Sequence, residues 1–271
     1  MDTIKNGIQI RTEVVGNQTL RVGIRAGNPA KAPLLLFNGI GANIEILAHF
    51  VDLFDDIEVI IFDIPGTGES PTPLVPYHLA AMAVLANNLL DHLGYAQQVD
   101  VMGISWGGAL AQEFAYLYPE RCRKLVLAAT TPGIGMVPGS ISVISKMLNP
   151  KRYTNPEYMT EIGGELYGGD FRDNPELIKE HASHLKRPEL RGYVYQLMAI
   201  MNWSSLRWLG TLKQKTLIMH GSDDPIVPLA NAEIMASRIP DSTLHVVDDG
   251  HLFLVSRAAE STATIREFLH G

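Results

Sequence analysis

The sequence predicts an α/β fold with an open, mostly parallel central sheet, helices on both faces and a helical segment inserted late in the chain. Residues 34–37 and 59–62 are continuous apolar runs, which are typical of strands buried on both faces of a parallel sheet. Strand-like and helix-like segments alternate along most of the chain, as such a sheet requires. A short apolar strand also leads straight into a helical pattern on either side of Ser105.

The elements can be assigned in order along the chain. Residues 8–15 and 19–24, separated by Gly16-Asn17, predict a β-hairpin. The segment 44–54 predicts a crossover helix, and apolar residues spaced by three or four predict an amphipathic helix over 82–93. The remaining predicted strands are 99–102, 124–128, 216–219 and 243–247, and the remaining predicted helices are 108–117, 231–238 and a closing helix that ends at Leu269.

Residues 131–210 interrupt this alternation. They contain five of the ten Met, five of the nine Tyr and two of the three Trp, interleaved with Pro and Gly. We expect a helical cap here, above the strand ends where such sheets bind ligands, and a core domain formed by residues 1–130 and 211–271. The segment could equally be an ordinary helical subdomain whose large side chains only pack. A soft lining would suit a long apolar substrate, and Met136, Met201 and Trp203 are the candidates for part of it.

Composition narrows the classes of function. The chain has 271 residues, 46% hydrophobic and 19% charged, with a formal charge of -7 and no basic run, which argues against nucleic acid or an anionic membrane as partner. No apolar stretch approaches the roughly 18 residues of a membrane span, and no secretory signal is visible, so we expect a cytoplasmic protein. The single Cys122 excludes an internal disulfide and a cysteine zinc site.

The pentapeptide Gly103-Ile104-Ser105-Trp106-Gly107 matches the nucleophile-elbow pattern G-x-S-x-G. Such a match can arise by chance, but here a strand precedes it and a helix follows it. That context holds a serine in a strained backbone conformation with its hydroxyl exposed at the helix N-terminus. Flanking glycines avoid a collision of β-carbons where strand and helix close on each other. The sequence therefore predicts a catalytic Ser105.

A serine nucleophile needs a base, and the base needs an orienting carboxylate. His251 follows a predicted strand on a loop that Gly250 leads, and we expect it to be the base. The acid lies on the loop after another strand, at Asp224 or Asp223, and the usual spacing from the loop glycine favours Asp224. Asp223 would then stabilise the turn.

Other histidines are expected to be structural or exposed. His220 and His245 lie next to or inside predicted strands, and five more are assigned to the surface or the cap, namely His78, His92, His181, His184 and His270. No H-x-x-x-H or H-E-x-x-H pattern occurs, so neither a metal site nor a cofactor is expected.

Acyl transfer also requires donors aimed at the oxyanion. One is expected to be the backbone N–H of Trp106, directly after the nucleophile. The second is assigned to the N–H of Ile40 in the loop after an early strand, with Gly41 as the alternative. This loop lacks the third glycine of a dinucleotide-binding fingerprint.

In these motifs the chain resembles α/β-hydrolases, and more narrowly the intracellular depolymerases of medium-chain-length poly(3-hydroxyalkanoates). The narrower resemblance is carried by Phe37-Asn38-Gly39-Ile40-Gly41-Ala42-Asn43, Ser105-Trp106-Gly107-Gly108-Ala109-Leu110-Ala111-Gln112, Tyr118-Pro119-Glu120-Arg121-Cys122, Met136-Val137-Pro138-Gly139, Tyr167-Gly168-Gly169 and Asp248-Asp249-Gly250-His251-Leu252-Phe253-Leu254. It implies hydrolysis of a stored polyester on cytoplasmic granules by a triad of Ser105, Asp224 and His251. A hydrophobic granule surface is then an implied partner.

Two other functions remain open from the sequence. The same triad could serve a general carboxylesterase or a carbon–carbon bond hydrolase acting on small esters or diketones. A hydrolase-fold binding protein without turnover is a third reading, against which the intact serine, histidine and acid loop argue.

Overall fold

The computed structural model describes residues 3–5 and 7–271, and in this part of the chain nine strands form one sheet in the order β1-β2-β3-β5-β4-β6-β7-β8-β9. The strands are β1 (Thr3–Lys5), β2 (Ile8–Val15), β3 (Gln18–Arg25), β4 (Leu34–Phe37), β5 (Val59–Phe62), β6 (Val99–Ile104), β7 (Cys122–Ala128), β8 (Lys215–Gly221) and β9 (Ser242–Val247). From β5 through β9 every neighbouring pair is parallel, and the first three strands add an antiparallel edge. The predicted fold class is confirmed.

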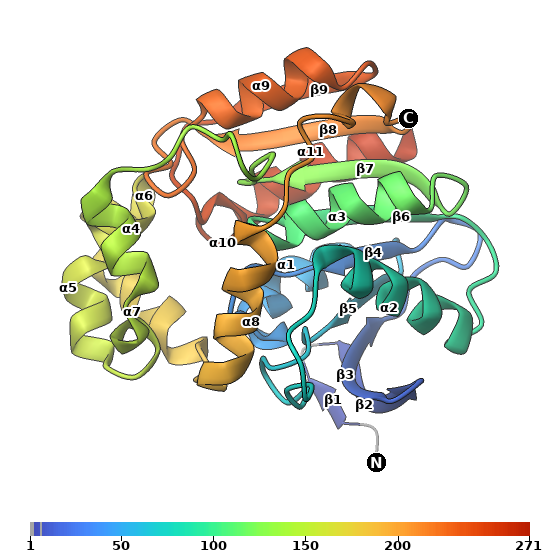
Figure 1. Ribbon diagram of the computed structural model, residues 1–271, viewed down its shortest axis with the longest axis horizontal. Coiled ribbons are helices and arrows are strands. Elements are labelled where there is room, and N and C mark those ends of the chain that lie inside the picture. The colour runs from blue at the N-terminus through green and yellow to red at the C-terminus, as the bar shows by residue number, and fades with distance from the viewer. Residues whose placement is uncertain (1–2, 6) are drawn as a thin grey trace.

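Helices cover both faces of this sheet (Figure 1). The α-helices are α1 (Ala48–Asp52), α2 (Leu79–His92), α3 (Trp106–Leu117), α4 (Ile141–Leu148), α5 (Pro156–Tyr167), α6 (Asp170–Asp173), α7 (Pro175–His184), α8 (Leu190–Met201), α9 (Ala230–Arg238), α10 (Phe253–Ser256) and α11 (Ala258–His270), and the 3-10 turns are η1 (Ile44–Leu47), η2 (Pro150–Tyr153) and η3 (Leu209–Thr211). The crossover helix expected over 44–54 is a 3-10 turn followed by the short α1. The other predicted core elements are present with small shifts of their ends.

Alternate residues of each buried strand supply two separate cores, because successive side chains of a strand point to opposite faces. Leu35 and Phe37 of β4 pack on the face covered by α2, α3 and α9. Leu34 and Leu36 of the same strand pack on the other face, with α1, α10 and α11. Burial on both faces explains why these strands are continuous apolar runs.

The segment between β7 and β8 contains helices α4 to α8, all within residues 131–210, and we call residues 131–210 the helical insertion. In Figure 1 helices α4 to α7 stand clear of the sheet at one side of the molecule, and α8 runs back toward it. The insertion has an apolar core of its own around Met159, Leu166 and Phe171. Whether it behaves as a separate domain stays a prediction.

No helix among the described residues is long and apolar enough to cross a membrane.

Candidate active site

Ser105 lies in a strained turn between β6 and α3. Its backbone has φ 55° and ψ -117°, a left-handed region that non-glycine residues seldom adopt. The surrounding structure holds it there, since the Ser105 N–H donates to the Ala128 carbonyl at 2.9 Å and the Thr130 hydroxyl donates to the Ser105 carbonyl at 2.6 Å. Strain of this kind persists only where its surroundings impose it, and it is common at active sites.

The two glycines of the pentapeptide are required by close backbone approach. A β-carbon on Gly103 would lie 2.1 Å from the Gly107 carbonyl oxygen, and one on Gly107 would lie 2.2 Å from that of Phe37. Both distances are far inside van der Waals contact, and both partners are backbone atoms that cannot move aside. The strand, the turn and the helix can therefore meet at this distance only with glycine at these two positions.

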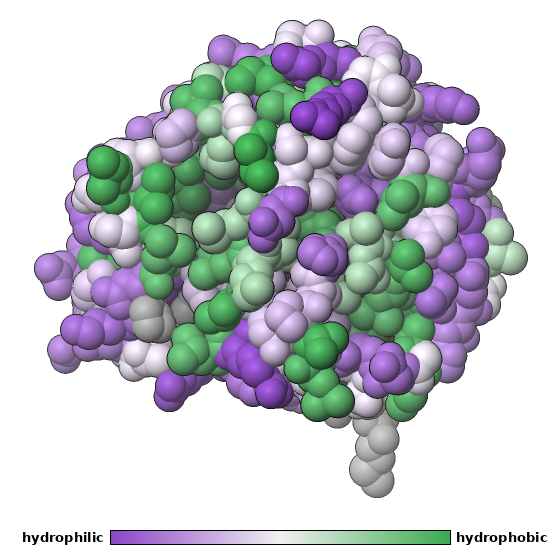
Figure 2. All heavy atoms as spheres, in the orientation of Figure 1, coloured by the Kyte–Doolittle hydropathy of each residue, from purple (hydrophilic) through white to green (hydrophobic). Residues whose placement is uncertain are grey.

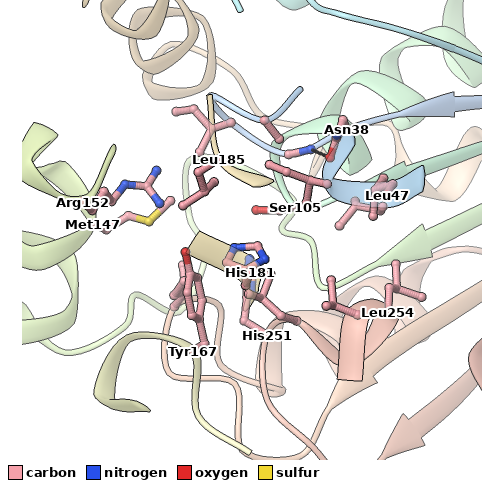
Figure 3. A pocket seen from close by; sticks show the side chains of 18 residues that line it. Asn38, Leu47, Ser105, Met147, Arg152, Tyr167, His181, Leu185, His251 and Leu254 are labelled. Atoms are coloured by element: carbon pink, nitrogen blue, oxygen red, sulfur yellow. Dashed lines mark hydrogen bonds between the residues drawn. The ribbon is translucent and has the colours of Figure 1, made fainter. Parts of the chain in front are cut away.

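Ser105 and His251 line the same pocket, and the Ser105 hydroxyl points into it (Figure 3). The loop after β4 contributes Asn38 and Ile40, the loop after β9 contributes His251, and α10 contributes Leu254. The helical insertion supplies the far wall, through Met147, Arg152, Tyr167, His181 and Leu185. The pocket thus lies between the carboxyl ends of the parallel strands and the insertion.

His251 is oriented by Asp224. Its Nδ1 donates to the Asp224 carboxylate at 2.7 Å, and both side chains are buried. The other Asp224 oxygen accepts the backbone N–H groups of Ile226 at 3.0 Å and Val227 at 2.9 Å. These three hydrogen bonds fix the ring orientation of His251 and favour the tautomer in which Nε2 carries no proton.

Asp224 is ionised at neutral pH. Burial alone would raise its pKa, but the neighbouring His251 and His220 rings outweigh that effect and lower the pKa to about 2. His220 is fully buried in β8, and its Nε2 donates to the Val227 carbonyl at 2.6 Å and lies 3.4 Å from Asp224. It holds the acid loop, in line with the structural role expected for it.

Asp223 faces away from His251. Its carboxylate accepts the Gly169 N–H at 2.9 Å and Arg172 Nη2 at 2.7 Å, both from the helical insertion. The Arg172 guanidinium is the first cause of its lowered pKa. Of the two candidate acids, only Asp224 contacts the histidine in this structure.

The tripeptide Tyr167-Gly168-Gly169 joins the insertion to this histidine. The Tyr167 carbonyl accepts the His251 N–H at 2.7 Å. A β-carbon on Gly168 would lie 2.0 Å from the Asp223 carbonyl, and one on Gly169 would lie 2.0 Å from an Asp249 carboxylate oxygen. This close packing explains why glycines stand here, and it means that the insertion helps to position His251.

The two expected oxyanion donors lie beside Ser105. Trp106 is the first residue of α3, so its N–H is at the helix N-terminus, and Ile40 lines the pocket. The alternative donor, the Gly41 N–H, instead donates to the Gln196 side-chain oxygen at 2.8 Å. The Gly41 N–H is thus engaged by the helical insertion, and the donor roles of Ile40 and Trp106 stay a prediction.

The structure corrects the residues chosen for the cap lining, because Met136, Met201 and Trp203 are absent from the wall of this pocket. Trp203 is buried in the core against α3, where its Nε1 donates to Glu113 at 2.7 Å. Met136 is half-buried and accepts a hydrogen bond from the Thr131 hydroxyl. Met201 is 70% exposed on the outer face of α8. Composition could not separate these positions from the true lining, because the insertion places its large side chains by tertiary packing.

Three polar residues of this wall were not named as pocket residues from the sequence. Arg152 lies in no motif, Tyr167 belongs to the Tyr167-Gly168-Gly169 piece without an assigned role, and His181, expected on the surface or in the cap, is a buried cap residue. Burial first, and then the charge of Arg152, lowers the pKa of His181 to about 4. The remaining expected surface histidines are not on this wall.

Comparison with known proteins gives consistent results. Residues 32–258 match the family model described as alpha/beta hydrolase fold. Over 260 residues the chain is 49% identical to the poly(3-hydroxyalkanoate) depolymerase of Ectopseudomonas oleovorans, covering 96% of this chain and 92% of that protein. It is 28% identical to 3-oxoadipate enol-lactonase 2 of Acinetobacter baylyi, over 82% of this chain and 83% of the relative. Among solved structures, a thermophilic esterase from Thermogutta terrifontis superimposes with a TM-score of 0.79 at 26% identity, covering 96% of this chain and 97% of the esterase.

Proposed function

The chain belongs to the alpha/beta hydrolase family, and we propose that it hydrolyses the ester bonds of medium-chain poly(3-hydroxyalkanoates) through Ser105, His251 and Asp224. The observation that carries this proposal is the 2.7 Å bond from His251 to Asp224 at the edge of a pocket that also holds Ser105. The likeness to a poly(3-hydroxyalkanoate) depolymerase over 96% of the chain supports the substrate class.

The proposed reaction proceeds in two steps. The Ser105 hydroxyl loses its proton to His251 Nε2 as its oxygen attacks the ester carbonyl, and the ionised Asp224 stabilises the imidazolium. The bond from the carbonyl carbon to the alcohol oxygen then breaks, and His251 returns the proton to that oxygen. Water, deprotonated by the same histidine, hydrolyses the acyl-enzyme and restores Ser105.

Negative charge on the carbonyl oxygen needs donors that are already in place. We assign this role to the N–H groups of Ile40 and Trp106. The loop that carries Ile40 is braced, because Asn38 Nδ2 donates to the Asn43 carbonyl at 2.9 Å and the Gly39 N–H donates to the Asn38 side chain at 2.8 Å. Preorganised donors stabilise the transition state without reorganising during the reaction.

The pocket walls suit an aliphatic chain. Apolar side chains on the wall come from both the core and the insertion, among them Leu47, Met147, Leu185, Ile226 and Leu254. Burying an alkyl chain gains about 0.8 kcal/mol per methylene. Each additional methylene that fits should therefore raise kcat/KM by up to roughly fourfold.

The outer surface of the insertion suits adsorption to a hydrophobic polyester granule. Leu190, Val194, Met198 and Met201 form an exposed stripe along α8, spaced four, four and three residues apart. Ile141, Ile144 and Leu148 form a second exposed stripe on α4. Figure 2 shows hydrophobic side chains gathered on the face that α4 and α8 present in this view. Apolar patches of this extent usually mark an interaction surface.

The substrate proposal is tested by kcat/KM across esters of two to ten acyl carbons, with turnover of medium-chain polyester measured beside short aryl esters. We expect kcat/KM to rise with acyl length and the polyester to be degraded. A steep decline beyond four carbons, with no polyester degradation, would leave a short-chain carboxylesterase and overturn the proposal.

Adsorption is tested by co-sedimentation with polyester granules. The double variant Val194→Ser/Met198→Ser should bind granules several-fold more weakly, while kcat/KM on a soluble medium-chain ester stays within twofold. The matched control, Val84→Ser/Val246→Ser, removes exposed apolar side chains on α2 and β9. Equal binding by the two double variants would refute the α8 surface as the adsorbing face.

A further inference from the structure

The pocket has two chemically different ends. Ser105 and His251 stand on the core side, and Arg152 of η2 enters from the opposite wall with its guanidinium directed into the space (Figure 3). Nothing in the proposed ester cleavage uses this arginine. Because Arg152 and Ser105 line the same pocket, a substrate bound there would contact the arginine.

Arg152 is built firmly into the wall. The residue is 5% exposed, and its Nη2 donates to the Tyr193 hydroxyl at 3.3 Å. That hydroxyl in turn donates to the Met147 carbonyl at 3.0 Å, and the guanidinium lies 5.7 Å from the centre of the Tyr193 ring. A planar guanidinium held on an aromatic ring has lost much of its freedom before a ligand arrives.

Arg152 carries the positive charge on this wall, because the neighbouring polar side chains Tyr167 and His181 are neutral. Burial raises the pKa of Tyr167, against the opposing effect of the Arg152 guanidinium, so Tyr167 is a neutral donor. The His181 ring packs edge-on against the Tyr167 ring, with 5.4 Å between the ring centres. Its pKa is lowered to about 4, so it is neutral at neutral pH. None of the described residues that line the pocket is Asp or Glu. The lining residues of this wall therefore bring one guanidinium and no carboxylate to the pocket.

A fixed guanidinium in an apolar, largely buried pocket selects for a carboxylate. Charge-assisted bonds between arginine and a carboxylate are shorter and about twice as strong as neutral ones, and they can form in pairs. The surrounding apolar side chains, such as Leu185 and Met147, lower the local dielectric and strengthen the attraction. An uncharged ester chain would gain far less from this group.

We propose that Arg152 binds the free carboxylate of the terminal unit of a hydroxyalkanoate chain, so that the enzyme cleaves the last ester bond at the carboxyl end. This inference rests on the proposed function, because it gives Arg152 a role in binding the substrate that Ser105 is proposed to cleave. In a 3-hydroxyalkanoate ester, two carbons separate the terminal carboxylate from the ester oxygen. A substrate held by its carboxylate at Arg152 would thus extend its last ester bond toward Ser105.

The bond changes follow from the proposed reaction. Ser105 attacks the carbonyl of the last ester bond, and the bond from that carbonyl to the 3-oxygen of the terminal unit breaks. His251 supplies the proton to the 3-oxygen, which releases one 3-hydroxy acid whose carboxylate Arg152 holds. Water then frees the shortened chain from Ser105, and that chain carries a new terminal carboxylate.

The test compares a dimer of 3-hydroxyoctanoate as the free acid with the same dimer as a terminal carboxamide. Cleavage of the internal ester is followed by chromatography. For the unaltered protein, kcat/KM should be at least tenfold higher on the acid. Arg152→Met should bring the two values within about twofold, by loss on the acid alone. The control Arg191→Met removes a half-exposed arginine outside the pocket and should keep the preference.

Binding gives a second readout that does not depend on turnover or on the stability of Arg152→Met. In a Ser105→Ala background, Arg152→Lys should raise the Kd for the acid dimer several-fold and leave that for the carboxamide unchanged, because lysine lacks the planar fork. Equal cleavage of acid and carboxamide by the unaltered protein would overturn the Arg152 inference and leave the proposed function standing. Failure to cleave either internal ester would instead overturn the proposed function.

Discussion

The nucleophile elbow and the helical insertion meet at one pocket, yet they are built in different ways. At the elbow, neighbours in the chain determine the geometry, since the β-carbons missing at Gly103 and Gly107 would strike backbone atoms at about 2 Å. In the insertion, the pocket residues Met147, Arg152, Tyr167 and His181 come from α4, η2, α5 and α7. The geometry around Ser105 is thus encoded locally, and the lining of the pocket is encoded by packing between distant segments.

The insertion is also attached to the core by contacts between residues that are far apart in the sequence. Polar contacts join the two, including Arg172 to Asp223 at 2.7 Å, Arg257 to Asp170 at 2.8 Å and Lys186 to Glu45 at 2.8 Å. Gln196 of α8 also accepts the Gly41 N–H, and its carbonyl accepts Trp106 Nε1 at 2.9 Å. No sequence motif predicts these contacts. Substitutions at the elbow should therefore affect turnover most, and substitutions in the insertion should affect selectivity and stability.

The largest effect is expected from Ser105→Ala, which removes only the attacking oxygen. Hydrolysis should fall by about 10⁴-fold or more, while the thermal unfolding midpoint stays within about 2 °C. His251→Ala should have a loss of similar size, and the double variant should be no worse than either, because the residues act as one unit. Retention of a tenth of the activity by Ser105→Ala would break the assignment.

The next effect separates the two adjacent acids. Asp224→Asn should lower kcat/KM by about 10³-fold or more, because asparagine cannot stabilise the imidazolium or hold the same tautomer. Asp223→Asn should lower it by less than about fivefold, since it only weakens a half-exposed contact with the insertion, to Arg172. Steady-state kinetics on one medium-chain ester decide this. A reversed ranking would move the acid to Asp223 and leave the rest of the mechanism intact.

A pair of glycine substitutions compares the two regions by stability. Gly107→Ala should lower the free energy of unfolding by about 3 kcal/mol, because its β-carbon would meet a backbone carbonyl at 2.2 Å. Gly210→Ala in η3, at the end of the insertion, should change it by less than about 1 kcal/mol, because its β-carbon would lie 3.6 Å from the nearest atom, the Arg238 carbonyl oxygen, which is an ordinary contact. Urea unfolding measures both. Similar losses would contradict the view that the elbow is the more tightly constrained region.

The smallest effect concerns acid stability of the insertion. His181 has a folded pKa of about 4, below its ordinary 6.5, so the unfolded chain takes up the proton first as pH falls. Stability is unaffected by this group above pH 6.5 and falls progressively as pH drops toward 4, by about 2 kcal/mol at pH 5. His181→Phe keeps the ring packing and should lose this part of the pH dependence, measured by urea unfolding at several pH values. Exposed His78, changed to Gln, is the control and should leave the profile unchanged.

The core and the elbow could be predicted from sequence because their signals are local and periodic. Continuous apolar runs identify β4 and β5, and the glycines around Ser105 report a backbone constraint that no other residue meets. The order of nucleophile, acid and histidine along the chain, each placed after a strand, is shared by this fold class. The loop spacing favours Asp224 over Asp223, and the structure adds that Asp224 contacts His251 whereas Asp223 contacts Arg172.

The residues of the insertion that line the pocket could not be predicted, because no local or periodic signal in the sequence identifies them. Trp203 and Met201 satisfy any compositional criterion for an apolar lining, yet one packs against α3 and the other faces outward. Arg152 and His181 would be expected at the surface from residue type, because charged and polar side chains are seldom buried. Arg152 contacts Tyr193, which is 41 residues away in the sequence. His181 packs against Phe171, which belongs to another helix.

The central claim is that Ser105 is the nucleophile for medium-chain hydroxyalkanoate esters. The most direct measurement is peptide-mapped mass spectrometry of the protein labelled with an alkyl fluorophosphonate, with and without a competing 3-hydroxyoctanoate oligomer. We predict a single adduct on the peptide that carries Ser105, which the oligomer suppresses more effectively than a short acetate ester does. An adduct on another residue, or a Ser105 adduct that the acetate ester suppresses and the oligomer does not, would contradict the claim.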